Sequence, residues 1–118
     1  MRRLKSEKIR LEPELIQRTE DGVILSTAVL DSYAAQLRQQ GRREDSVRNF
    51  EKIFRQFYDA LPESKLIERE TLARWREQLL KEGYAIRTAN SKVSIVNGLL
   101  ESMDCREYQV SGQLDPER

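Results

Sequence analysis

Residues 46–61, Ser-Val-Arg-Asn-Phe-Glu-Lys-Ile-Phe-Arg-Gln-Phe-Tyr-Asp-Ala-Leu, carry the clearest structural pattern in this chain. Their apolar side chains recur three and four residues apart, the spacing that gathers side chains on one face of an α-helix. Pro62 follows directly and cannot continue a helix, so we expect the helix to end at Leu61. The apolar positions are Val47, Phe50, Ile53, Phe54, Phe57 and Leu61.

The same spacing predicts three further helices, over residues 26–40, 70–82 and 88–103. Ser26 or Thr27 is suited to cap the first of them, and Gly41 and Gly83 follow two helices as C-terminal glycines. The side chains expected to point inward are Val29, Leu30, Tyr33, Leu37, Leu72, Trp75, Leu79, Val93, Val96, Leu99, Leu100 and Met103.

The predicted fold class is all-α, a single bundle of four helices. No segment alternates clearly between apolar and polar residues, so we expect residues 23–25 to be an apolar lead-in to the first helix and not a strand. With 118 residues the chain has the length of one domain. We expect a flexible basic and polar extension over 1–22, the helical domain over 23–104 and a tail over 105–118.

Composition argues against several classes of function. The chain has no histidine, which removes Ser-His-Asp and Cys-His catalysis and nearly every zinc site. Its five glycines are scattered and form no phosphate loop, and its single cysteine, Cys105, forms no disulfide framework. We therefore expect no catalytic residue, no metal and no cofactor in this chain. No apolar run could span a membrane and the N-terminus lacks a secretory signal, so a cytoplasmic protein is expected.

Charge is segregated along the chain although Lys+Arg (21) nearly balance Asp+Glu (20). Residues 1–10 carry five basic groups and one acid, and residues 38–58 carry six basic groups and three acids. Residues 86–98 carry two basic groups and no acid, whereas the last eighteen residues are net acidic. A near-neutral total is therefore compatible with an anionic partner for the basic segments.

Two of the predicted helices begin in the same way, because Gly41 and Gly83 are each followed five residues later by a hydroxyl residue, Ser46 or Thr88. The start of a helix has unpaired N–H groups and a partial positive charge, both suited to phosphate. Basic and polar side chains cluster at both places, so the sequence predicts a nucleic-acid backbone as ligand. The candidates are Arg42, Arg43, Ser46, Arg48, Asn49 and Lys52 at the first, and Arg87, Thr88, Asn90, Ser91 and Lys92 at the second.

A structural interpretation of these residues remains open. Ser46 and Thr88 could serve only as N-caps, each contributing about 1 kcal/mol to stability. Arg48, Lys52 and Arg55 recur at helical spacing and could form a solvated face with weak ion pairs. Glu44 and Asp45 would repel a phosphate beside them.

The order of these pieces resembles the N-terminal core-binding domain of the tyrosine recombinases, the phage integrase family. The resemblance covers roughly residues 25–103, and no single motif in it is diagnostic. The matching residues are Leu25-Ser-Thr, Tyr33-Ala-Ala-Gln-Leu37, Gly41, Ser46-Val-Arg-Asn-Phe50, Phe54, Phe57, Leu72-Ala-Arg-Trp75, Leu79, Gly83-Tyr84, Thr88-Ala-Asn90, Lys92 and Ser94.

This resemblance implies a SAM-like orthogonal bundle of four helices that forms half of a clamp around duplex DNA. It implies that a separate C-terminal catalytic domain of the same protein cuts and rejoins strands, and that other protomers assemble on the DNA. The residues it turns toward DNA are Ser46, Arg48, Asn49, Lys52, Arg87, Thr88, Asn90 and Lys92. The chain departs from the family at Ser91 and Asn97, where arginines are frequent. Residues 107–110 resemble the family's interdomain linker, so we expect a fragment of a longer protein.

Two other functions compete with this interpretation. A small SAM-like domain could use its charged helix faces to bind proteins, with no role for nucleic acid. A self-contained enzyme is the third alternative, and the lack of histidine argues against it. A DNA clamp requires the turns at 42–46 and 87–88 to lie side by side, whereas a protein adaptor would interleave them with acids such as Glu44, Asp45 and Glu77.

Overall fold

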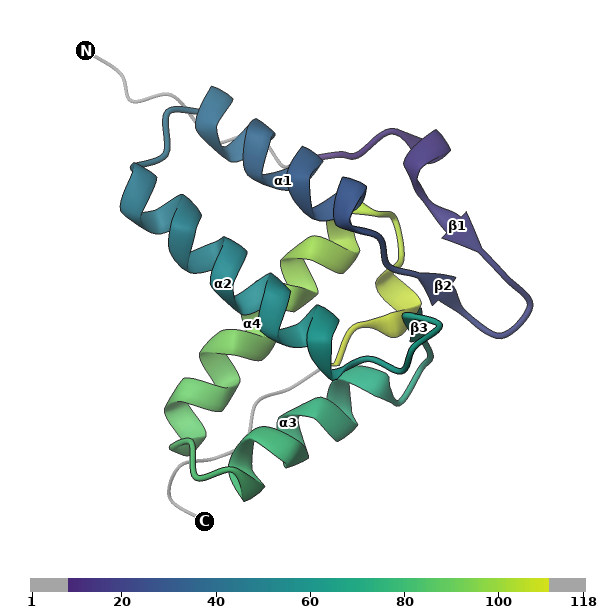
Figure 1. The fold of residues 1–118 in the computed structure, drawn as a ribbon, viewed down its shortest axis with the longest axis vertical. Coiled ribbons are helices and arrows are strands. Elements are labelled where there is room, and N and C mark those ends of the chain that lie inside the picture. The colour runs from purple at the N-terminus through teal and green to yellow at the C-terminus, as the bar shows by residue number, and fades with distance from the viewer. Residues whose placement is uncertain (1–8, 111–118) are drawn as a thin grey trace.

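Four helices make up most of residues 9–110, the part of the chain that the structure, a computed structural model, describes. They are α1 (Thr27–Gln39), α2 (Glu44–Ala60), α3 (Thr71–Lys81) and α4 (Ile86–Ser102). Figure 1 shows α1 beside α2, with α4 crossing behind α2 and reaching α3 below it. The predicted all-α bundle is confirmed, and each helix boundary falls within about two residues of its predicted place.

Three of the helices end in the same hydrogen-bonded turn. After α1, the Gly41 N–H donates to the Arg38 carbonyl and the Arg42 N–H to the Leu37 carbonyl. The N–H groups of Gly83 and Tyr84 do the same at the end of α3, and those of Asp104 and Cys105 at the end of α4. This Schellman pattern needs a left-handed residue, and Gly41 and Gly83 have φ of 82° and 102°.

The predicted caps are right for α1 and wrong for the two helices that follow a glycine turn. Ser26 caps α1, because its hydroxyl accepts from the Val29 N–H. The N-cap of α2 is Arg43 and that of α4 is Ala85, and neither contributes a side-chain capping bond. Since both helices begin three residues after their glycine, Ser46 and Thr88 lie at the third helical position.

A small antiparallel sheet, which the sequence did not predict, lies at one edge of the bundle (Figure 1). Its strands are β1 (Gln17–Arg18), β2 (Val23–Ile24) and β3 (Leu66–Ile67), in the order β1-β2-β3. Each strand has two residues, too few for an alternating pattern to be recognised. Gly22 is needed here because a Cβ at this position would collide with the Ile67 carbonyl.

The expectation of a loose N-terminal extension is wrong for residues 9–22. Leu11 is buried in the core and its N–H donates to the Ser102 carbonyl, and a 3-10 turn over Pro13–Leu15 leads into β1. Arg18 forms an ion pair with Glu107, which joins the β1–β2 hairpin to the segment after α4. Residues 1–8, the most basic part of the expected extension, lie outside the described residues.

The segment after α4 also packs on the domain up to residue 110. Asn97 of α4 donates from its carboxamide to the Val110 carbonyl and accepts from the Val110 N–H, each at 3.0 Å. Gln109 donates to the Asn97 carbonyl at 2.8 Å. Asn97 therefore holds residues 109–110 against α4 through its side chain and its backbone carbonyl. Residues 111–118 of the expected tail lie outside the described range.

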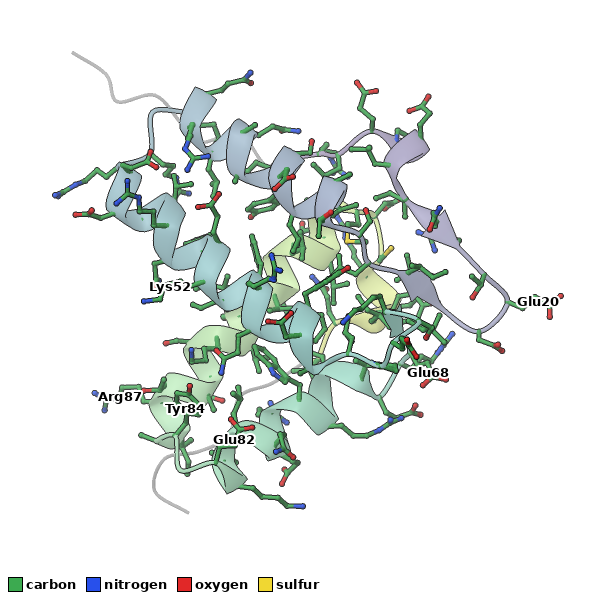
Figure 2. The ribbon with its side chains drawn as sticks, viewed as in Figure 1. Glu20, Lys52, Glu68, Glu82, Tyr84 and Arg87 are labelled. Carbon is green, nitrogen blue, oxygen red and sulfur yellow. The ribbon has the colours of Figure 1, made fainter. Side chains whose placement is uncertain are left out.

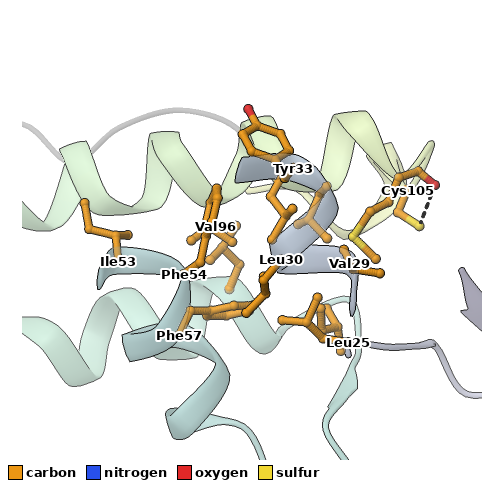
Figure 3. Close-up of a cluster of buried hydrophobic side chains, with 14 of the residues drawn as sticks. Leu25, Val29, Leu30, Tyr33, Ile53, Phe54, Phe57, Val96 and Cys105 are labelled. Atoms are coloured by element: carbon orange, nitrogen blue, oxygen red, sulfur yellow. Dashed lines mark hydrogen bonds between the residues drawn. The ribbon is translucent and has the colours of Figure 1, made fainter. Parts of the chain in front are cut away.

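One continuous core joins all four helices and the sheet. Figure 3 shows a part of it in which side chains of α1, α2 and α4 meet. Tyr33 of α1 meets Phe54 of α2 edge to face at 5.1 Å between ring centroids, and Phe57 of α2 meets Trp75 of α3 at 5.0 Å. The predicted core position of Trp75 is confirmed, with 5% of its surface exposed. Cys105 is a buried free thiol whose S–H donates to the Met103 carbonyl, and burial raises its pKa.

Candidate nucleic-acid interface

Most of the predicted contact residues lie on the surface, as an interface requires. Lys92 is half-buried and Asn90 is buried, with 7% of its surface exposed. The prediction that Asn90 contacts DNA is therefore wrong, because it lies on the side of α4 that packs into the core, next to buried Ala89. The exposed candidates are Arg42, Arg43, Ser46, Arg48, Asn49, Lys52, Arg87, Thr88 and Ser91.

The two basic turns do not lie side by side. Figure 1 shows the α1–α2 turn and the α3–α4 turn separated along the longest axis of the molecule, with the length of α2 crossing α4 between them. The arrangement expected of a clamp, in which residues 42–46 and 87–88 form one patch, is therefore absent from the described residues. Basic side chains meet elsewhere, where the middle of α2 faces the beginning of α4.

An open groove lies at this meeting place, between α2 on one side and the α3–α4 turn and α4 on the other. We call it the α2–α4 groove. It contains three of the predicted residues, Asn49, Lys52 and Lys92, from two different helices. Figure 2 shows Lys52 and Arg87 extending from the same side of the molecule, with Tyr84 beside Arg87. The groove is lined by Asn49, Lys52, Arg55, Gln56, Asp59, Tyr84 and Lys92.

Lys92 is held in this groove by two uncharged groups. Its ammonium donates to the Gln56 carboxamide oxygen at 2.8 Å and lies 4.9 Å from the centroid of the Tyr84 ring. The Gln56 amide nitrogen in turn donates to the Tyr84 hydroxyl at 3.1 Å. We call these three side chains the Lys92 cluster. Since neither partner carries a charge, the full positive charge of Lys92 remains in the groove.

The other basic residues of α2 differ in how far their charge is offset. Arg48 pairs with Glu44 at 3.6 Å and Arg55 pairs with Asp59 at 3.4 Å, each across one helical turn. Lys52 forms no ion pair or hydrogen bond within residues 9–110, and it is exposed. Lys52 and Lys92 therefore account for the net positive charge of the α2–α4 groove.

At the α1–α2 turn, acidic side chains offset the positive charge of the arginines more strongly than they do in the α2–α4 groove. Arg38 donates to both carboxylate oxygens of Glu44, at 3.1 and 2.8 Å, and also lies 3.5 Å from Glu51. These bonds from Arg38 hold the pKa of the Glu44 carboxyl below its usual value, so it stays ionised. The first turn of α2 contains two acids, Glu44 and Asp45, whereas the first turn of α4 contains none.

Sequence reasoning missed two members of the site, Gln56 and Tyr84. Gln56 lies four residues after Lys52 and so follows it on one helical face, a spacing that was visible in the sequence. Tyr84 follows Gly83 directly, but only the packing of α3 against α4 shows that its ring reaches α2. No pattern in the sequence predicts that the Asn97 side chain binds the backbone of Val110.

No family model, curated protein or solved structure matches the chain. Within residues 9–110 no helix has the length and apolar character needed to cross a bilayer. The same residues contain no group of three or more histidine, cysteine, aspartate or glutamate side chains placed to hold a metal ion.

Proposed function

We propose that this chain is a DNA-binding module that contacts duplex DNA through the α2–α4 groove. The observation that carries the proposal is the meeting of Lys52 and Lys92, from different helices, in one groove, where neither forms an ion pair within residues 9–110. Phosphate oxygens along a nucleic-acid backbone attract such cations, and the release of counterions supplies most of the affinity.

The start of α4 extends this surface. Its N-terminus has no side-chain cap and no acid in the first turn, and Arg87 and Thr88 are exposed there. Unpaired N–H groups, a hydroxyl and a guanidinium favour an anion. Arg87 precedes Lys92 by five residues on α4, and Figure 2 shows its side chain extending toward the same edge of the view as that of Lys52, so we propose it as a further phosphate contact beside the groove.

The resemblance to the core-binding domain of tyrosine recombinases supplies the wider part of the proposal. The module would hold duplex DNA while a separate C-terminal catalytic domain of the same protein cuts and rejoins strands. Further protomers would assemble on the same DNA, in the cytoplasm. Residues 109–110, which Asn97 holds against α4, would then begin the connection to the catalytic domain.

A second candidate function is a small helical domain that binds proteins. The α1–α2 turn favours it, because Arg38, Glu44 and Arg48 form a mixed-charge network there. This surface would repel phosphate at its carboxylates and suits a polar protein partner of mixed charge. The two candidates use different parts of α2, its first turns for a protein partner and its middle for DNA, so they predict different effects of the same substitutions.

Salt dependence of DNA binding tests the proposal. Fluorescence anisotropy of a labelled duplex of about 20 base pairs would be measured at salt concentrations of about 50 and 200 mM. Four phosphate contacts, by Lys52, Arg55, Arg87 and Lys92, predict a loss of about two orders of magnitude in affinity over this range. The absence of binding at the lower salt concentration would contradict the proposal and favour the protein-binding alternative.

A further inference from the structure

We propose that Gln56 and Tyr84 are positioning residues that hold the ammonium of Lys92 ready for one phosphate of the DNA backbone. The inference rests on the proposed function and assigns roles to two residues that do not themselves attract an anion. The Lys92 cluster brings together three elements: α2 supplies Gln56, the α3–α4 turn supplies Tyr84, and α4 supplies Lys92.

Each member of the Lys92 cluster fixes another. The Gln56 carboxamide uses its oxygen for the Lys92 ammonium and its nitrogen for the Tyr84 hydroxyl, so it has one defined orientation. The Tyr84 ring lies 4.9 Å from the Lys92 nitrogen and attracts it through the face of its π-system. A free lysine side chain loses much rotational freedom when it binds a phosphate. In the cluster, that loss has occurred before DNA arrives.

The chemistry of the partners matters as much as their positions. A carboxylate at position 56 would also orient Lys92 but would offset its charge by forming an ion pair, as Glu44 pairs with Arg48 on the same helix. A carboxamide orients the ammonium and leaves its charge intact. One of the three N–H groups on that ammonium donates a hydrogen bond to Gln56. Within residues 9–110 the ammonium makes no other hydrogen bond. A phosphate oxygen can therefore be bound without breaking the cluster.

Lys52 completes the site from the other side of the groove. It precedes Gln56 by four residues on α2 and so lies one helical turn along the same face. Lys52 has no partner within residues 9–110, whereas Lys92 is held on two sides. The groove thus combines one cation without a partner in residues 9–110, Lys52, and one cation held by two neutral side chains, Lys92.

A double-mutant cycle for duplex binding, measured at several salt concentrations, tests the inference. K92A is expected to weaken binding about tenfold and to reduce the slope of log affinity against log salt by about 0.9. Q56A is expected to weaken binding about threefold with the slope unchanged, because Lys92 must then be ordered on binding. In the K92A background, Q56A is expected to have no further effect.

Two isosteric variants and one control accompany the cycle. Y84F removes only the hydroxyl and is expected to weaken binding less than Q56A does. Q56E places a carboxylate against Lys92 and is expected to weaken binding at least as much as K92A. Q78A serves as the control, because Gln78 is an exposed glutamine on α3, bonded to Glu82 outside the groove. Thermal unfolding of every variant verifies that it is folded.

The outcomes separate the two proposals. A wild-type protein that binds no duplex would overturn the proposed function and the inference with it. Binding that depends on Lys92 but is unchanged in both Q56A and Q56E would overturn the positioning role alone. Equal losses from Q56A with and without Lys92 would also overturn it, since Gln56 would then act independently of the lysine.

Discussion

The α1–α2 turn and the α3–α4 turn have the same backbone and differ in what their side chains do. In both, the carbonyl of a leucine two residues before the end of the helix accepts from the N–H of the residue after a left-handed glycine. In both, the next helix begins three residues after that glycine with no side-chain cap. The residue after the glycine is Arg42 in one turn and Tyr84 in the other.

This difference, together with the charge of the first turn of the next helix, separates a solvent-exposed turn from a turn that contributes to the α2–α4 groove. Arg42 is exposed, and the acids that follow it at 44 and 45 offset the start of α2. Tyr84 is half-buried and reaches Gln56 on α2, and no acid occupies the first turn of α4. The two turns therefore share one backbone connection between helices, while their side chains give the starts of α2 and α4 different local charge.

The largest expected effect comes from removing the two groove lysines. K52A/K92A removes two phosphate contacts, so duplex affinity at about 50 mM salt should fall by up to about 100-fold and the salt slope by about 1.8. The matched control is R42A/R43A, which removes two basic residues from the other turn and should change affinity less than about threefold. Anisotropy titrations measure both. A larger loss from the control pair would reverse the comparison.

The glycines test whether the two turns are equivalent as structures. G41A and G83A should each destabilise the protein by about 1 kcal/mol, because both place a side chain in left-handed backbone although nothing lies near the added Cβ. G98A is the opposite case, since this glycine lies inside α4 and its Cβ would meet only the Tyr33 hydroxyl at an ordinary 3.6 Å. It should stabilise by up to about 1 kcal/mol. Urea unfolding measures all three, and unequal costs at 41 and 83 would contradict the equivalence.

Removing Glu44, the acid that offsets positive charge at the α1–α2 turn, should make the charge of this turn more like that of the α3–α4 turn. E44Q removes the carboxylate partner of Arg48, leaves Arg38 with Glu51 as its carboxylate partner, and makes the net charge at the start of α2 more positive. Duplex affinity at low salt should rise about two- to threefold. E63Q, an exposed acid between α2 and β3, is the control for the change in total charge. An equal rise in both variants would show that the gain is not specific to this turn.

The smallest effect concerns the titration of Glu44 itself. Because Arg38 donates to its carboxylate, the pKa of Glu44 is lowered in the folded state. A lowered pKa means that the ion pair adds stability above the unfolded-state value and that this is lost as pH falls through the folded-state value. Carboxyl NMR titration of the wild type and of R38A measures it. R38A should raise the Glu44 midpoint toward the usual value, and an unchanged midpoint would show that Arg38 does not hold the carboxylate.

The helices and the core were predictable from the sequence because both follow from local spacing. The apolar stripe from Val47 to Phe57 defines α2, similar stripes define the other three helices, and Gly41, Gly83 and Pro62 mark where three of the four end. The sheet was not predictable, because β2 and β3 are two residues each and pair across more than forty residues of chain. The N-caps were misjudged because the glycine turn, and not the nearest hydroxyl, fixes where each helix begins.

The site was predictable in its residues but not in its arrangement. Lys52, Asn49 and Lys92 were identified as basic and polar residues near helix starts. Their shared groove depends on where α4 crosses α2, which no local pattern records. Asn90 was predicted as a contact, but it is buried with 7% of its surface exposed. Gln56 and Tyr84 were overlooked because neither is charged, and their importance comes only from their bonds to each other and to Lys92.

The most direct test of the α2–α4 groove as the binding site is an NMR titration of the labelled protein with duplex DNA at about 50 mM salt. We predict that the largest amide and side-chain shifts occur at Lys52, Gln56, Tyr84 and Lys92, including the Gln56 carboxamide protons. Arg42 and Arg43 in the α1–α2 turn should shift little. Shifts concentrated at the α1–α2 turn, with the groove unchanged, would contradict this account.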